Sequence, residues 1–253
     1  MKKIFIVTAG IIFLAILIAF VFGFVMLGSV VKAGVEKVGP LVTKVPVKLD
    51  GAAVSIFSGK GELKGFEIGN PEGYKTPNAI KVGSVGVAVV PKSVFGDKII
   101  IRSINVQAPE ITYETGLNQN NLNQILANVQ SVAGKSESAQ SGGSKQPKKL
   151  QVDEFVIAGG KINVSATLMG GQSATLPLPE IRISNLGQGP EGITPAELAE
   201  KVIAAIVNGT AKAVAEGGVG IAKDAAKTSV DSAKKAGTEA TKSLQKVGDL
   251  FKK

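Results

Sequence analysis

Residues 79–90, Ala-Ile-Lys-Val-Gly-Ser-Val-Gly-Val-Ala-Val-Val, decide how the rest of the chain has to fold. So many valines in one short run are typical of a β-strand. Regular alternation puts apolar side chains on both faces of that strand: Val82, Ala88 and Val90 on one, and Val85, Val87 and Val89 on the other. A strand that is apolar on both faces has to be covered on both faces. Either helices cover the second face, or it is an open groove that holds something apolar.

On both sides of this strand the sequence predicts further strands with turn residues between them. The expected strands before the next helix are Val47–Phe57, Gly61–Ile68, Lys98–Val106 and Glu110–Thr115. Leu117 to Val132 has helical spacing, with Leu122, Ile125, Leu126 and Val129 on one stripe. A second group of strands is expected at Leu150–Ala158, Lys161–Leu168 and Ala174–Asn185, with turns at Gly159-Gly160 and Gly170-Gly171. These short turns predict a meander of antiparallel hairpins, because parallel neighbours need a long crossover connection.

The N-terminus carries an apolar run. Between Lys3 and Lys32, the 28 residues from Ile4 to Val31 contain no charge. As a helix this run reaches about 42 Å, which exceeds the roughly 30 Å hydrocarbon core of a bilayer. The run is too long for the apolar region of a signal peptide. We therefore expect an uncleaved transmembrane anchor that ends at Ile4 and Val31, with a short cytoplasmic N-terminus.

The C-terminal part is expected to be helical. Thr194-Pro195-Ala196-Glu197 combines an N-cap threonine, a proline at the first helical position and a glutamate three residues after the cap. Leu198, Val202, Ile206 and Ala213 then form an apolar stripe. From Val219 onward small apolar residues recur at helical spacing among lysines, which suits packing on the sheet, lying on anionic lipid, or a solvated helix.

These patterns divide the chain into six segments. They are a transmembrane anchor (1–33), a neck (34–46), a β segment with a helix (47–132), a flexible linker rich in Ser, Gly and Lys (133–149), a second β segment of the same sheet (150–190) and an amphipathic helical region (194–253). The expected fold class is α+β with mainly antiparallel strands.

Composition excludes several kinds of active site. The 253 residues contain no Cys and no His, so thiolate or imidazole metal ligands, cysteine nucleophiles, histidine-based triads and disulfides are all absent. The glycines around Lys60 lack the spacing of a phosphate-binding loop. No pair of carboxylates has a spacing that indicates acid–base catalysis. We expect no enzyme activity, no metal and no cofactor.

The charge balance indicates an anionic neighbour. The 29 Lys and Arg residues exceed the 20 Asp and Glu residues by nine. Only Arg102 and Arg182 are arginines, and five of the ten phenylalanines lie in the first 24 residues. Reading bases and phosphates relies largely on arginine and on exposed aromatic rings. A membrane surface therefore suits the chain better than nucleic acid does, and a lysine-rich surface that only confers solubility is the simplest alternative.

Three stretches together resemble the AsmA-like family of bacterial envelope proteins. They run from Val54 to Tyr74, including Asn70-Pro71-Glu72-Gly73-Tyr74, from Ile99 to Glu114, including Ala108-Pro109-Glu110-Ile111, and over Asn120-Asn121-Leu122. The resemblance covers residues 1–130 and, less fully, 150–187. It implies an inner-membrane anchor and a periplasmic sheet curled into a groove, in a small member of a family linked to lipid movement and outer-membrane biogenesis.

From the resemblance we expect a non-enzymatic, single-pass inner-membrane protein that binds or passes lipid in the periplasm. The implied partners are phospholipid, an envelope protein and a second copy of the chain. The groove wall is expected to include Val85, Val87, Val89, Ile162, Val164 and Leu168. The alternatives are a structural tether or assembly factor without a groove, and a protein whose lysine-rich tail senses a lipid surface.

Overall fold

The computed structural model describes residues 27–115, 119–138, 148–165 and 174–217. The chain divides into two compact units, residues 1–210 and residues 211–253. In the second unit the described residues, 211–217, are helical. The expected amphipathic tail beyond Val219 lies outside the described residues.

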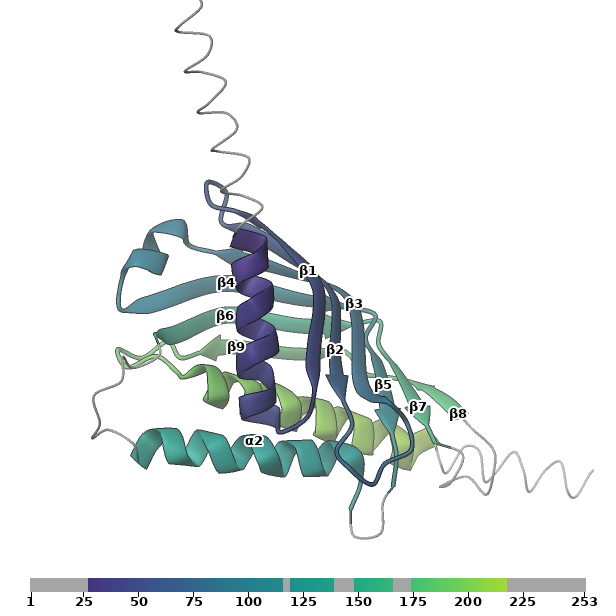
Figure 1. Ribbon diagram of the computed structural model, residues 1–253. Coiled ribbons are helices and arrows are strands. Elements are labelled where there is room, and N and C mark those ends of the chain that lie inside the picture. The colour runs from purple at the N-terminus through teal and green to yellow at the C-terminus, as the bar shows by residue number, and fades with distance from the viewer. Residues whose placement is uncertain (1–26, 116–118, 139–147, 166–173, 218–253) are drawn as a thin grey trace, which may run out of the picture. The chain divides into compact units, whose positions relative to one another are not determined.

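The described part of the first unit is an α+β fold built on one nine-stranded, mainly antiparallel sheet. Its strands are β1 (Val47–Ser55), β2 (Lys60–Gly69), β3 (Asn78–Val89), β4 (Lys98–Gln107), β5 (Glu110–Tyr113), β6 (Lys149–Ala158), β7 (Lys161–Val164), β8 (Ala174–Pro177) and β9 (Ile181–Leu186). Its helical elements are the N-terminal helix (27–43), the short helix η1 (Pro91–Phe95), α2 (Asn121–Ser138) and the C-terminal helix (195–210 within this unit). Figure 1 shows the sheet curling around the N-terminal helix.

Six of the nine strands are halves of three longer ones. Along β3, the pairing offset to β4 (Ser84 with Gln107) is the same as the offset to β5 (Lys81 with Glu110). The offset of β4 to β6 equals that of β5 to β7, and the register of β6 with β9 equals that of β7 with β8. Thus β5 continues β4, β7 continues β6, and β8 leads into β9. The sheet is six strands wide.

The breaks in these strands form one line across the sheet, which we call the kink row. The constant offsets align Gly65, Gly83, Ala108, Gly159 and Pro179. Gly65, Ala108 and Gly159 have positive φ values of 59°, 47° and 66°. Glycine adopts this conformation easily, and proline cannot donate a ladder hydrogen bond. Backbone hydrogen bonds resume beside the row, as between the N–H of Lys161 and the carbonyl of Pro109 at 2.8 Å.

The kink row changes which side chains point inward. Regular alternation puts Val82 and Val85 on opposite faces, yet both are buried and both line the same cavity. The same three-residue step separates Leu63 from Phe66 on β2, and Val106 from Pro109 on the neighbouring strand. The prediction that the strand at 79–90 is apolar on two opposite faces is therefore wrong, because a backbone kink reverses the alternation.

The predicted all-antiparallel meander is also wrong in part. Strand β6 lies parallel to β4, and β7 lies parallel to β5. The connection from β5 to β6 contains α2, which supplies the crossover that a parallel pair requires. Gly159-Gly160 is a kink between collinear strands instead of a hairpin turn, and the single strand expected at Ala174–Asn185 is broken at Pro179. Gly170-Gly171 lies outside the described residues.

The N-terminal helix packs closely along the edge strand β1. A Cβ atom at Gly28 would lie 2.1 Å from the carbonyl oxygen of Ala52, and one at Gly39 would lie 2.7 Å from the Cβ of Val47. Between these contacts, the Glu36 carboxylate accepts a hydrogen bond from the Leu49 N–H at 3.2 Å, and the Lys32 ammonium donates to the Leu49 carbonyl. This pair satisfies backbone groups on the outer edge of β1, where another strand could otherwise add.

The start of the C-terminal helix is confirmed as a capping box. The Thr194 hydroxyl accepts a hydrogen bond from the Glu197 N–H at 3.1 Å, and the Glu197 carboxylate accepts one from the Thr194 N–H at 2.5 Å. Two backbone donors of the first turn are thereby satisfied. The pKa of Glu197 is lowered, mainly by its hydrogen bond from the Thr194 backbone, so the cap stays ionised at neutral pH.

Other element boundaries differ from the sequence prediction. The segment expected as a neck (34–46) is helical to residue 43. Helix α2 begins at Asn121 and continues to Ser138, into the expected linker at 133–149. Within the described part of the chain no helix combines the length and hydropathy needed to cross a membrane. Of the expected anchor (1–33), only residues 27–33 are described.

A candidate apolar binding cavity

A cavity of about 470 Å³ lies between the curled sheet and two helices. Its floor comes from inward side chains of β1 to β6, including Phe66 on β2, Val85 on β3 and Phe155 on β6. The N-terminal helix contributes one wall and the C-terminal helix another. Among the described lining residues Thr43 has the only polar side chain, and its hydroxyl is hydrogen-bonded to the carbonyl of Gly39 at 2.9 Å.

The helix walls follow from simple sequence spacing. Pro195, Leu198, Val202 and Ile206 recur every three or four residues, which places them on one stripe facing the cavity. This confirms the stripe expected at Leu198, Val202 and Ile206. The opposite wall uses a similar spacing but small residues, and its Gly34 has no other atom within 4 Å of its Cβ position. A side chain placed at Gly34 would therefore meet open space at the cavity.

The six residues expected in the groove wall have different positions. Val85 is buried and lines the cavity. Ile162 and Val164 are buried on β7 but are not among the lining residues. Val87 and Val89 are half-buried and also lie outside the lining set. Leu168 lies outside the described residues. Of the two expected ends of the membrane anchor, Ile4 also lies outside them, and Val31 is half-buried in the N-terminal helix.

Most of the lining could not be predicted from the sequence. The sequence predicts strands around Phe66 and Phe155 but not that these rings point inward, and it predicts a neck at 34–46, which contains Gly34 and Val38. The helical spacing of Val35, Val38 and Val42 was a usable signal, since it continues one apolar stripe beyond the membrane anchor. No comparable sequence pattern indicates which side chains of the sheet point inward, because the kink row reverses the alternation of inward and outward positions.

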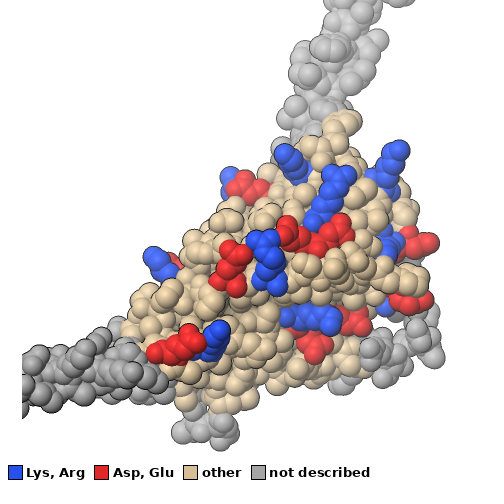
Figure 2. All heavy atoms as spheres, turned by 180° about the vertical axis from the view of Figure 1, so that it is seen from behind, with Lys and Arg blue, Asp and Glu red and all other residues tan. Residues whose placement is uncertain are grey.

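The opposite face of the sheet is charged. Figure 2 shows basic and acidic side chains mixed across it instead of gathered by sign. They form ion pairs on neighbouring positions, such as Lys81 with Glu67 at 3.0 Å and Lys64 with Glu62 at 3.5 Å. Exposed pairs of this kind contribute little to stability but keep the surface soluble. This face therefore needs no cover.

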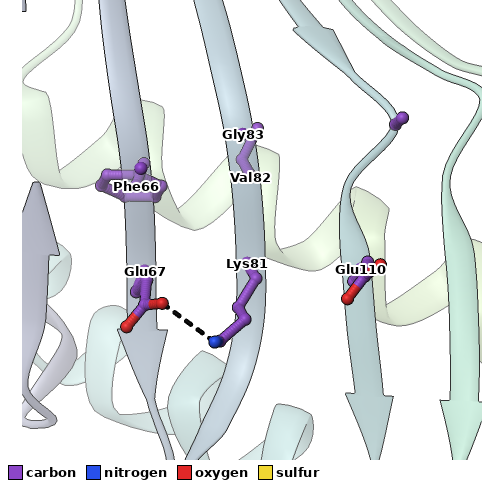
Figure 3. Close-up of a pocket in the computed structure, with 8 residues that line it drawn as sticks. Phe66, Glu67, Lys81, Val82, Gly83 and Glu110 are labelled. Carbon is purple, nitrogen blue, oxygen red and sulfur yellow. Dashed lines mark ion pairs between the residues drawn. The ribbon is translucent and has the colours of Figure 1, made fainter. Parts of the chain in front are cut away.

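A smaller hollow of about 340 Å³ lies on this charged face at the kink row. Figure 3 shows Glu67 reaching toward Lys81, while Glu110 lies on the next strand. Gly83 leaves the hollow open, because no atom lies within 4 Å of its Cβ position, whereas at Gly65 the Asp50 side chain occupies the space that a Cβ atom would need. No cluster of three or more acidic residues occurs among the residues described, so the hollow lacks a carboxylate metal cage. The apolar cavity is the stronger candidate.

The motifs quoted above for the family resemblance form a buried polar network. Asn121, at 0% exposure, donates to the carbonyl of Thr112 at 2.8 Å and to the side-chain oxygen of Asn70 at 2.7 Å. Its own side-chain oxygen accepts the N–H of Glu114 at 3.0 Å. The network ties the β2–β3 loop, the end of β5 and the start of α2 together. Its role is structural, because none of these residues lines the cavity.

Glu114 is the charged member of this network and is 4% exposed. Burial raises the pKa of its carboxyl, but hydrogen bonds from the Thr76 hydroxyl at 2.6 Å and the N–H groups of Lys75 and Thr76 outweigh burial. The net effect lowers the pKa below its ordinary value of 4.5. Glu114 is therefore ionised at neutral pH, and protein hydrogen bonds take the place of water around its carboxylate.

This shift predicts an acid-sensitive fold. Because the folded pKa of Glu114 lies below the unfolded one, its stabilisation is present above about pH 4.5 and is lost as pH falls through the folded pKa. Glu114→Gln should be less stable than the unsubstituted protein at pH 7 and should lose less stability between pH 7 and pH 3. Denaturant unfolding of the full chain in detergent at each pH measures this, with Glu110→Gln as the exposed control. Equal pH slopes with and without Glu114 would contradict the assignment.

The geometry defines a curled sheet closed by helices around an apolar cavity, with a charged outer face. The model of the AsmA family matches residues 1–168, which is more than half of the chain. The chain belongs to the AsmA family, and this membership points to a role in the bacterial envelope. No curated protein and no solved structure matches the chain significantly.

Proposed function

We propose that this protein is a non-enzymatic, membrane-anchored envelope protein that binds a phospholipid acyl chain in its apolar cavity. The observation that carries the proposal is the cavity lining, in which Thr43 is the one polar side chain among the residues described. A ligand held there gains by leaving water and needs few hydrogen bonds. A sugar, nucleotide or peptide would lose its hydrogen bonds to water without replacing them.

Burial energetics favour a hydrocarbon ligand. Each methylene group that moves from water into an apolar site is stabilised by about 0.8 kcal/mol. The cavity volume of about 470 Å³ lies in the usual range for small-ligand sites, roughly 300–1,000 Å³. It suits part of one lipid, with the headgroup left outside. The proposed role is holding or passing lipid during outer-membrane biogenesis, together with a partner protein or a second copy of the chain.

The proposed location is the periplasmic face of the inner membrane. Its membrane attachment is supported by the uncharged run from Ile4 to Val31, which leads directly into the N-terminal helix, and the periplasmic side is proposed from the family resemblance. That helix is itself a wall of the cavity, so the anchor would hold the cavity close to the bilayer. Membership of the AsmA family agrees with an envelope location.

Gly34→Leu tests the proposed ligand site. Because no atom lies within 4 Å of the Gly34 Cβ position, the new side chain should enter the cavity without a clash. Replacing a helical glycine should also stabilise the helix by up to about 1 kcal/mol. We expect the variant to fold at least as well as the unsubstituted protein and to carry several-fold less phospholipid, measured by mass spectrometry of lipid co-purified with the full chain.

Gly134→Leu is the matched control. Gly134 lies in α2, also has no atom within 4 Å of its Cβ position, and does not line the cavity. It should leave the bound lipid unchanged. Equal lipid in both variants would show that lipid is held elsewhere, and no lipid in the unsubstituted protein would favour a structural tether.

A further inference from the structure

Two loops of the first unit expose large apolar side chains. The turn between β1 and β2 carries Ile56 and Phe57, and η1 carries Val94 and Phe95. Phe57 is 75% exposed and Phe95 is 87% exposed. Exposed aromatic rings at the tips of two separate loops are unusual on a soluble surface and indicate contact with an apolar environment.

The two loops lie together at one end of the sheet. The N–H of Val89 donates to the carbonyl of Gly59 at 2.7 Å, and a Cβ atom at Gly59 would lie 3.1 Å from the ring of Pro91, the first residue of η1. The N-terminal helix starts at the same end, because Gly28 packs on Ala52 near the end of β1. The described start of the N-terminal helix, which includes the last residues of the uncharged run from Ile4 to Val31, therefore lies at the same end of the sheet as these loops (Figure 1).

Basic residues surround the loops. The lysines at this end are Lys60, Lys92, Lys98, Lys148 and Lys149, against the acidic residues Asp97 and Glu191. One of these lysines is held against η1, because the Lys148 ammonium donates to the carbonyl of Val94 at 2.6 Å. Lys98 instead donates to the carbonyl of Gly189, in the loop that follows β9, at 3.1 Å. Lysines around exposed aromatic rings suit anionic headgroups above an acyl-chain boundary.

We propose that residues 56–57 and 92–95 form a bilayer-docking surface, with Phe57 and Phe95 inserted at the headgroup boundary of an anionic phospholipid membrane. This inference takes one element from the proposed function, namely the membrane anchor that brings the surface to the bilayer. Docking holds the sheet with its kink row and far loops away from the membrane. It makes three attachments of the domain to one bilayer: the anchor and two loop tips.

The absence of tryptophan from the chain gives a direct test. Single-tryptophan variants Phe57→Trp, Phe95→Trp and, as a control in the exposed loop at the opposite end of the sheet, Glu72→Trp are made in the full chain. Each is mixed with vesicles of phosphatidylethanolamine and phosphatidylglycerol in which a fraction of the acyl chains is brominated. We expect blue-shifted and quenched emission from Phe57→Trp and Phe95→Trp, and neither change from Glu72→Trp.

Emission from Phe57→Trp and Phe95→Trp that matches Glu72→Trp would overturn the docking proposal and would favour a protein partner for these loops. Replacing phosphatidylglycerol by phosphatidylcholine, or adding Lys60→Gln and Lys92→Gln, should reduce the quenching, since the lysines then lose their anionic partners. Equal quenching under both conditions would contradict the role of charge. Lipid content is measured separately on Gly34→Leu, so a failure of the cavity proposal is distinguishable from a failure of docking.

Discussion

Asn121→Ala should destabilise the first unit by about 3–4 kcal/mol, the largest loss expected from a single side chain here. The substitution removes the partner of the Glu114 N–H, the Thr112 carbonyl and the Asn70 side chain at once. Asn121 is 0% exposed and Glu114 is 4% exposed, so water replaces the lost bonds poorly at this point. Leaving buried polar groups unpaired costs more than the bonds themselves contributed. Denaturant unfolding followed by circular dichroism measures the loss.

Asn123→Ala provides the control for Asn121→Ala. Asn123 lies two residues further along α2, is half-buried and carries the same side chain, so the same atoms are removed. Its replacement should change stability by about 0.5 kcal/mol or less. Similar losses from the two variants would mean that the network does not hold the β2–β3 loop and α2 together.

Gly39→Leu should separate the N-terminal helix from β1. A Cβ atom at Gly39 would lie between 2.7 and 2.9 Å from three carbon atoms of Val47, which is itself buried. Overpacking of this kind costs about 1–3 kcal/mol, more than the gain of up to about 1 kcal/mol from replacing a helical glycine. Because the helix forms a cavity wall, we expect the variant to unfold at lower denaturant concentration and to retain less lipid.

Gly34→Leu separates these two effects, since it lies on the same helix and has free space. It should keep or raise stability while it lowers lipid content, whereas Gly39→Leu should lower both. If Gly39→Leu were as stable as Gly34→Leu, the close packing of the N-terminal helix on Val47 would not be needed for the fold.

Much of the secondary structure could be predicted from local patterns. The strand near 79–90 was found because valine density is a local property, and the C-terminal helix because a capping box is contained in the four residues from Thr194 to Glu197. The AsmA-like resemblance was carried by motifs such as Asn70 to Tyr74 and Asn120-Asn121, which the structure places in one polar network.

The cavity was predicted only in outline. Its floor depends on which side chains face inward, and that depends on backbone φ values at Gly65, Ala108 and Gly159. The sequence allows such values at glycines but does not require them, and at Ala108 it disfavours them. Parallel pairing of β4 with β6 depends on where α2 crosses the sheet, which is a long-range property. Val85 could therefore be predicted as a residue of the cavity wall, but Phe66 and Phe155 could not.

The two helical walls of the cavity come from opposite ends of the first unit, and this has a consequence for biosynthesis. A ribosome completes the N-terminal helix and β1–β5 long before it reaches Thr194. Until residues 195–206 arrive, the apolar floor has only one wall and is open to its surroundings. A chain that stops short of Thr194 would present that surface to chaperones, proteases and other nascent chains. The packing of residues 195–206 is thus the step that buries the apolar interior of the newly made protein, whether or not a ligand is bound.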